Sequence, residues 1–238
     1  MTEFLTQLKD NLVFVLICIG IAAALAVVAV LVERFALKPR EVSRARRISI
    51  VASCAAIATL MHLLDFPLLF LAPEFYQLDL SELPVMLCGF YLGPSAVVTC
   101  EAVKILLKLV LKGTTTAFVG DFANFVVGCS LVLPAVTIYH IRRTRATALW
   151  GLGVGTLVLT IFGSVFNAIY LLPKFSELYG MPLDSIIAAG TAINGNIDSL
   201  STFILFSVVP INLIKGVTIS LLTAIMYKRF VRPLFNMK

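Results

Sequence analysis

The chain has 238 residues, of which 60% are hydrophobic and 13% are charged, and its mean hydropathy is +1.00. Because a soluble domain carries about 25% charged residues, this composition excludes a water-soluble globular protein and predicts a protein embedded in a lipid bilayer. The net charge of +6 does not indicate nucleic acid binding, since the basic residues lie between apolar runs and no recognition motif accompanies them. Those runs are long and unbroken, which favours helices over barrel strands of alternating polarity. The sequence therefore predicts an all-α integral membrane protein.

Seven membrane spans are predicted in chain order. The first, residues 12–32, is uncharged and long enough to cross about 30 Å of hydrocarbon. Its start is not basic and no small-residue cleavage site follows, so we interpret it as a true span and not as a signal peptide. The others are 48–64, a short span at 81–92, 95–111, 122–141, 149–172 and 200–227.

The distribution of arginine and lysine predicts the orientation. Residues 34–47 contain six basic residues against Glu41, which indicates a cytoplasmic segment. Alternation then places 142–145 and the C-terminal tail in the cytoplasm, and both are rich in basic residues. The segment 65–79 and a long polar loop expected at 174–199 fall outside. The N-terminus is thus predicted outside and the C-terminus inside the cell.

The common motifs of catalysis and metal binding do not occur in the sequence. It has no Walker A motif, no HExxH, no nucleophile elbow and no Cys/His zinc pattern. The five cysteines lie inside apolar runs and are interpreted as apolar filler. The two histidines, His62 and His140, are placed near opposite faces, which argues against a paired haem site. The glycines of 151–155 begin a span and favour helix packing. We predict neither an enzyme nor a catalytic cofactor or metal.

Polar residues at membrane depth are costly and usually face a cavity or a partner. Glu101, Lys104 and Lys108 lie on one helical face. Two alternatives stay open for them, an internal salt bridge that neutralises Glu101 or contact with a ligand. Asp121 and Asn124 open the next span, where Asp121 is also a candidate helix cap.

The later spans carry three further polar residues. Asn167 lies in the last turns of the sixth span, and Asn212 and Lys215 share a face of the seventh. Lys215 has no acidic neighbour in its own span, and an unpaired lysine there costs about 2.5–3.5 kcal/mol. Compensation by a distant carboxylate, by snorkelling or by a ligand is possible, and ligand contact is favoured. On the second span, Ala52 and Ala56 form a small-xxx-small pattern that permits close helix approach.

Eight short strings in one order carry a resemblance to a known family. They are 78–84 (LDLSELP), 89–94 (GFYLGP), 101–104 (EAVK), 113–116 (GTTT), 120–125 (GDFANF), 180–184 (GMPLD), 192–194 (AIN) and 210–216 (PINLIKG). Over residues 46–230 the series resembles the riboflavin-specific S component, the substrate-binding subunit, of bacterial energy-coupling factor (ECF) transporters. The sequence departs from this pattern at Asp121, where the family is expected to carry a glutamate of longer reach.

The resemblance implies a six-helix S-component core with cytoplasmic ends, in the bacterial plasma membrane. Residues 1–45 then form an additional N-terminal transmembrane helix with a basic cytoplasmic linker, and 46–238 the substrate-binding membrane domain. It also implies a vitamin pocket near the outer face, covered by the loop after the first core helix. The implied partners are a transmembrane coupling protein, expected to contact Ala52 and Ala56, and two cytoplasmic ATPases. The implied flavin contacts are Leu78, Asp79, Leu80, Thr116, Asn124, Asn167, Asn212 and Lys215.

The expected function is capture of riboflavin at the outer face and its delivery to the cytoplasm, with ATP hydrolysed by the partners. Three alternatives remain at this point. The first is another ligand, FMN, FAD or a different vitamin, with Lys104, Lys108 and Lys112 available for phosphates. The second is a membrane enzyme or haem carrier. The third is a stand-alone ion-coupled transporter in which Glu101 and Asp121 carry protons.

Overall fold

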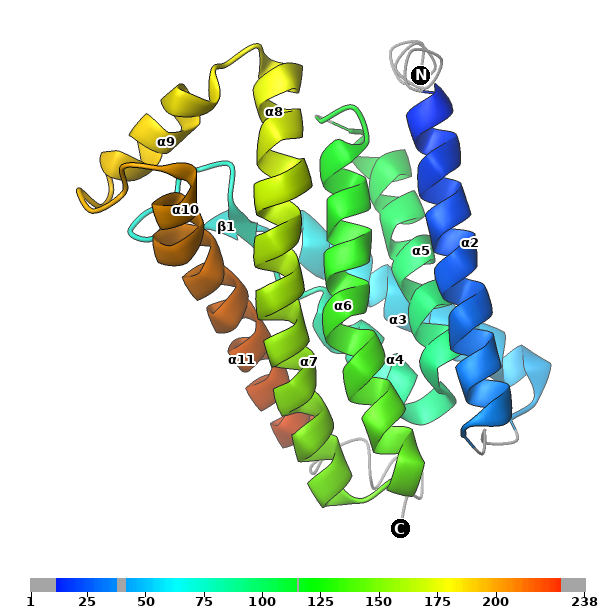
Figure 1. Cartoon of the computed structure of the whole chain (residues 1–238). Coiled ribbons are helices and arrows are strands. Elements are labelled where there is room, and N and C mark those ends of the chain that lie inside the picture. The colour runs from blue at the N-terminus through cyan, green and yellow to red at the C-terminus, as the bar shows by residue number, and fades with distance from the viewer. Residues whose placement is uncertain (1–11, 38–41, 115, 228–238) are drawn as a thin grey trace.

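The computed structural model describes residues 12–37, 42–114 and 116–227, and these residues form a helical bundle (Figure 1). The α-helices are α2 (Leu12–Phe35), α3 (Arg44–Leu63), α4 (Glu82–Leu92), α5 (Pro94–Leu111), α6 (Val119–Arg142), α7 (Arg145–Phe166), α8 (Leu172–Tyr179), α9 (Leu183–Thr191), α10 (Leu200–Phe203) and α11 (Val209–Met226). Two π-helical segments, η1 (Asn167–Leu171) and η2 (Ile204–Val208), join α7 to α8 and α10 to α11.

Several of these helices are long and apolar enough to cross a bilayer. Within the described ranges, length and composition select five segments: Leu12–Phe35, Arg44–Leu63, Val119–Arg142, Arg145–Leu178 and Leu200–Met226. Large apolar side chains such as Val110 and Trp150 remain exposed on the outside of the bundle, as expected for surfaces that face lipid. The predicted all-α membrane fold is confirmed.

Helix α4 differs from the span predicted at 81–92. Its 11 residues extend about 17 Å, which is about half of the hydrocarbon thickness. The helix is buried at nearly every position, so protein and not lipid surrounds it. Gly93, with φ of +111°, then turns the chain into α5. Helix α4 is therefore a buried half-span that begins inside the bundle.

The polar loop predicted at 174–199 is wrong for most of its length. Residues up to 179 continue the long helix that begins at Arg145, and 183–191 form α9. The side chains of Phe175 and Ile186 are buried, so both helices are amphipathic and pack against the bundle. Each π-helical segment ends two residues before a proline, Pro173 or Pro210. A proline lacks the N–H that the helix requires, and a π-helical turn is one known way to accommodate it.

The segment between α3 and α4 closes on itself as a small hairpin. Strands β1 (Phe66–Pro67) and β2 (Gln77–Leu78) pair antiparallel, with Phe66 opposite Leu78. The hairpin lies at the same end of the bundle as α9 (Figure 1), which we call the hairpin end. Because the strands return the chain to its starting point, residues 76–79 lie over the interior of the bundle.

Helices α6 and α7 pack along most of their length. A Cβ on Gly151 would lie 2.5 Å from the Ala135 carbonyl oxygen, and one on Gly155 would lie 2.4 Å from that of Leu131. Only glycine permits such backbone proximity. The helix-packing interpretation is therefore confirmed for Gly151 and Gly155 but not for Gly153, where a Cβ would meet no atom within 4 Å.

Candidate substrate pocket

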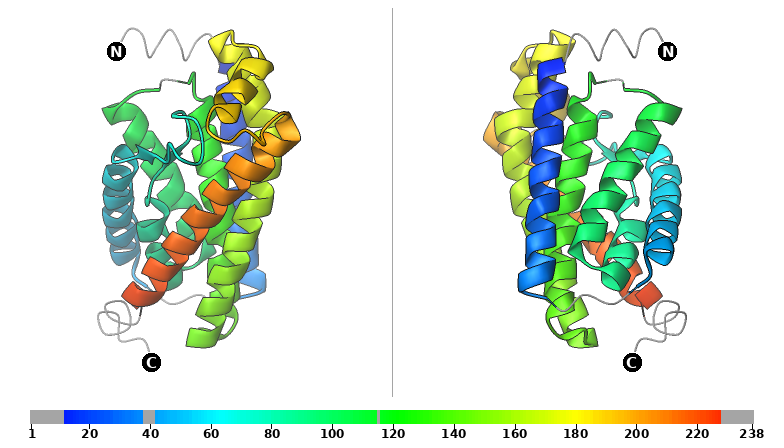
Figure 2. Two further views of the ribbon diagram at one scale, coloured as in Figure 1. Left: turned by 90° about the vertical axis from the view of Figure 1, so that its left-hand side faces the viewer. Right: turned by 90° about the vertical axis from the view of Figure 1, so that its right-hand side faces the viewer.

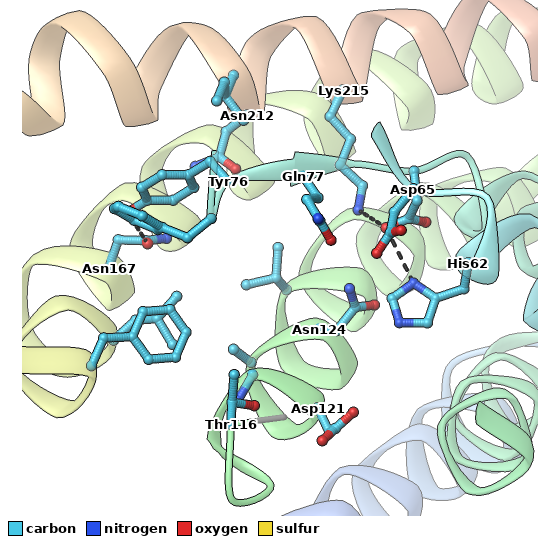
Figure 3. Close-up of a pocket in the computed structure, with 18 of the residues that line it drawn as sticks. His62, Asp65, Tyr76, Gln77, Thr116, Asp121, Asn124, Asn167, Asn212 and Lys215 are labelled. Atoms are coloured by element: carbon cyan, nitrogen blue, oxygen red, sulfur yellow. Dashed lines mark hydrogen bonds and ion pairs between the residues drawn. The ribbon is translucent and has the colours of Figure 1, made fainter. Parts of the chain in front are cut away.

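A cavity of about 230 Å³ opens at the hairpin end of the bundle. Its walls come from the end of α3, the hairpin segment, α5 and the α5–α6 connection, α6, η1, α8 and α11 (Figure 3). Six of the predicted ligand contacts line it: Asp79, Thr116, Asn124, Asn167, Asn212 and Lys215. The other two predicted contacts, Leu78 and Leu80, are not among the lining residues. Leu78 is buried with 4% exposure, and Leu80 packs against the main hydrophobic core. Residues far apart in sequence thus converge on one cavity.

Lys215 has two carboxylate partners from another part of the chain. Its Nζ lies 3.2 Å from Asp79 Oδ2 and 3.1 Å from Glu82 Oε1. The ring of His62 also lies beside Asp79, with Nδ1 3.4 Å from the same carboxylate oxygen (Figure 3). The sequence analysis favours a ligand as the group that compensates the charge of Lys215. The structure shows that two distant carboxylates already pair with this lysine.

A second buried cluster lies beneath the pocket. Lys104 Nζ is 2.6 Å from Glu101 Oε2 and 3.6 Å from Glu82 Oε1, and all three side chains are fully buried. Lys104 also donates to Ser81 Oγ at 3.1 Å and to Asn124 Oδ1 at 3.3 Å. The salt-bridge alternative for Glu101 is confirmed, and Lys104 holds the Asn124 amide in the pocket wall.

The remaining lysines of the wall are also paired. Lys108 contacts Asp121 at 2.5 Å, and Lys112 contacts Asp65 at 3.7 Å. Asp121 thus pairs with a lysine and is not the N-cap of α6, which is Phe118. In the first turn of α6, the Gly120 N–H donates to Thr116 Oγ1 at 3.0 Å. The lining contains three lysines (108, 112 and 215) and three aspartates (65, 79 and 121). The three lysines and three aspartates balance, so apart from His62 the pocket has polar walls without a net charge.

The two asparagines of the wall differ in what they offer to a ligand. Asn212 is 6% exposed, and its Nδ2 has no hydrogen-bond partner among the described residues. Asn167 is already bonded, because its Oδ1 accepts from Tyr76 Oη at 2.7 Å and its Nδ2 donates to the Gly163 carbonyl oxygen at 2.7 Å. Asn212 Nδ2 is therefore a buried donor without a partner among the described residues, whereas both polar groups of Asn167 already make a hydrogen bond.

Several wall residues were missed by the sequence analysis. They are His62, Asp65, Phe75, Tyr76, Gln77 and Phe175. The segment 65–79 was expected to cover the pocket, but no spacing rule selects individual side chains of an irregular loop. His62 lies at the end of a span, where an interfacial role was the simplest interpretation. Among the described residues, no group of three or more His, Cys, Asp or Glu side chains could hold a metal ion.

Ala52 and Ala56, the predicted contacts of a partner, are both exposed on α3. Their neighbours Ala55 and Ala58 are fully buried against the core. The two predicted residues therefore share an outward face of small side chains. Their role in partner binding stays a prediction.

The comparisons with known proteins place the chain in a family. Residues 46–227 match the family described as "ECF transporter, substrate-specific component". The chain belongs to this family of S components. Riboflavin transporter RibU of Staphylococcus aureus is 34% identical over 184 residues, 77% of this chain and 89% of the relative. Riboflavin transporter FmnP of Bacillus subtilis is 26% identical over 185 residues, 77% of this chain and 91% of the relative.

A solved structure, "Structure and mechanism of the S component of a bacterial ECF transporter", is similar to this S component. It is 31% identical, with a TM-score of 0.65, and the match covers 82% of this chain and 100% of that chain. The family match begins at residue 46, after the whole of α2. Helix α2 is thus additional to the region that defines the family.

Proposed function

We propose that this S component captures riboflavin in the pocket at the hairpin end and delivers it to the cytoplasm with the rest of an ECF transporter. Two relatives that cover most of the chain are named riboflavin transporters. The observation that carries the proposal is the pocket itself, whose charged side chains cancel while a buried Asn212 donor remains unpaired among the described residues. Such a site suits an uncharged ligand with polar ring edges.

The balance of charges favours riboflavin over FMN. A phosphate group is bound most strongly by cations that are free to pair with it. Lys108, Lys112 and Lys215 each have an aspartate partner, and Lys104 lies between two glutamates. An FMN phosphate would compete with these carboxylates for each lysine, whereas riboflavin requires no extra positive charge.

The aromatic residues of the wall suit a flat ring system. Phe75, Tyr76 and Phe175 line the pocket, with the rings of Phe75 and Tyr76 4.9 Å apart. A ligand ring that reaches Asn167 has to displace the Tyr76 hydroxyl. We therefore propose that the hairpin segment opens and closes over the isoalloxazine ring, with Asn212 bonding to its polar edge. The protein itself makes and breaks no covalent bond in this scheme.

Membrane orientation and partners complete the proposal. The hairpin end faces outward and the C-terminus lies in the cytoplasm, since the basic segments 34–47 and 142–145 favour the cytoplasmic side. A transmembrane coupling protein binds the exposed Ala52 and Ala56 face, and two ATPases hydrolyse ATP. The outward position of both alanines supports this arrangement.

The absorbance spectrum of the purified protein tests the ligand. Protein prepared in detergent from riboflavin-supplemented cells is expected to retain a yellow chromophore with flavin bands, released on denaturation in stoichiometric amount and identified as riboflavin by chromatography. A colourless protein that does not bind added riboflavin would contradict the proposal. Recovery of FMN in place of riboflavin would overturn the assignment of the ligand.

Gly163→Ala is expected to weaken riboflavin binding about tenfold. A Cβ at Gly163 would lie 2.9 Å from Asn212 Nδ2, so the amide has to leave its position in the wall. Gly153 on the same helix is the matched control, because a Cβ there meets no atom within 4 Å. Gly153→Ala is expected to change the affinity less than about twofold, since only helix propensity changes. If fluorescence titration gives equal riboflavin affinities for the two variants, the position of the Asn212 amide does not affect binding.

A further inference from the structure

Helix α2 is attached to the rest of the protein through a buried carboxylate. Glu33, near its end, is 8% exposed. Its Oε2 accepts a hydrogen bond from the Ser95 backbone N–H at 3.0 Å and another from the Ser95 hydroxyl. Its Oε1 lies 3.6 Å from Arg47 Nη1, and Arg47 Nη2 donates to Ser95 Oγ at 2.5 Å. Three helices, α2, α3 and α5, therefore meet at one ion pair.

The geometry of this junction is specific to its residues. The Ser95 N–H is in the first turn of α5, where backbone N–H groups lack partners within the helix and a negative charge is stabilised. Gly93 permits the approach, because a Cβ there would lie 3.1 Å from the Glu33 carboxylate. A helix that served only as a lipid anchor would have no need of a buried charge, which is costly unless paired.

The middle of α2 packs against α5 and α6. Ala22, Leu25, Ala26 and Ala29 belong to a cluster with Val98, Ile105, Phe125 and Cys129. The small side chains of α2 let the helices approach closely, as is common within membranes. Figure 2 shows α2 running beside the bundle along most of its height.

The other end of α2 reaches the wall of the pocket. The ring of Phe14 lies 6.0 Å from that of Phe122 at 83° and 6.5 Å from that of Tyr170 at 14°. Phe14 packs against a cluster formed by Val119, Ala123, Leu171 and Phe175. Three members of that cluster, Ala123, Leu171 and Phe175, also line the cavity. Phe14 thus supports this part of the wall from behind.

We infer that α2 is a fixed part of the substrate-binding unit and that Phe14 is a positioning residue for the pocket. The Glu33 junction holds one end of the helix, and Phe14 at the other end braces α6 and η1 around the ligand. The inference rests on the proposed function for the identity of the ligand. It also means that the division at residue 45, drawn from the family resemblance, does not separate two structural units.

The first test compares Phe14→Ala with Leu16→Ala, two truncations within the same turn of α2. Leu16 is the control because its side chain is 58% exposed. In riboflavin titrations by fluorescence quenching, Phe14→Ala is expected to weaken binding about fivefold and Leu16→Ala less than about twofold. Phe14→Leu, which keeps an apolar side chain at the wall, is expected to restore most of the affinity. Equal affinities of the Phe14→Ala and Leu16→Ala variants would overturn the role of Phe14.

The second test measures the attachment of α2 without any ligand. Glu33→Gln removes the charge of the junction, and Glu74→Gln removes an exposed charge from the hairpin segment as the control. In detergent, Glu33→Gln is expected to lower the apparent melting temperature by several degrees, and Glu74→Gln is expected to leave it unchanged. If the wild type fails to quench riboflavin, the proposed function fails, yet this melting comparison still decides whether α2 is fixed. Identical melting of both variants would overturn the inference.

Discussion

Lys215→Ala is expected to weaken riboflavin binding about 100-fold, the largest effect on affinity in this protein. The substitution removes the cation between Asp79 and Glu82, which lie 3.2 and 3.1 Å from Lys215 Nζ. Both carboxylates are almost completely buried, and truncating one partner of a buried charge pair typically costs 2–5 kcal/mol or more. Asp79 then turns toward other groups, and the wall gains a net negative charge. The equilibrium dissociation constant from fluorescence titration measures the effect.

Lys112→Ala is the matched control for Lys215. Lys112 lines the same pocket, but its side chain is 45% exposed and its partner Asp65 is 3.7 Å away. An exposed pair of this kind contributes about 0–1 kcal/mol, so the affinity is expected to change less than about fivefold. If the two lysine substitutions weaken binding equally, net charge and not the buried pairing of Lys215 controls affinity.

Lys104→Met is expected to cause the largest loss of stability. It leaves Glu82 and Glu101 without the cation that lies 3.6 and 2.6 Å from them, in a region where all three side chains are fully buried. Breaking a buried ion pair by removing one partner costs about 3–5 kcal/mol. We therefore expect the apparent melting temperature in detergent to fall by about 10 °C.

The double variant Lys104→Met with Glu101→Gln separates electrostatics from packing. In Lys104→Met, Glu82 keeps Lys215 as a partner at 3.1 Å, whereas Glu101 loses its cation. Neutralising Glu101 removes this unpaired carboxylate, so the double variant is expected to melt at a higher temperature than Lys104→Met alone. Failure of the second substitution to recover any stability would show that Lys104 contributes through the packing of its chain and not through its charge.

Hydropathy was sufficient to predict the membrane fold but not the shape of every segment. The first span is the clearest case, because residues 12–32 form an uncharged apolar run and helix α2 covers all of them. Helix α4 was predicted as a short span because hydropathy measures polarity and cannot distinguish lipid from a protein interior. Helix α9 lay within a segment taken as a polar loop, since short amphipathic helices alternate apolar and polar residues. The π-helical segments have no periodic signal of their own.

The candidate site was predictable where a polar residue lies in an apolar run. Asn212 and Lys215 were selected in this way, and both line the cavity. The partners of Lys215 were not predictable, because Asp79 is 136 positions away and the pairing depends on how the hairpin folds back. Tyr76 was missed for the same reason. The role of each wall residue in ligand binding stays a prediction.

Calorimetric titration of the detergent-purified protein with riboflavin and with FMN tests the central claim most directly. The account predicts saturable binding of one riboflavin for each protein chain, with FMN weaker by about tenfold or more, because every lysine of the described wall is paired with a carboxylate. Binding of FMN as tightly as riboflavin would contradict the role given to these pairs. If riboflavin produces no heat of binding in this titration, riboflavin capture itself is contradicted.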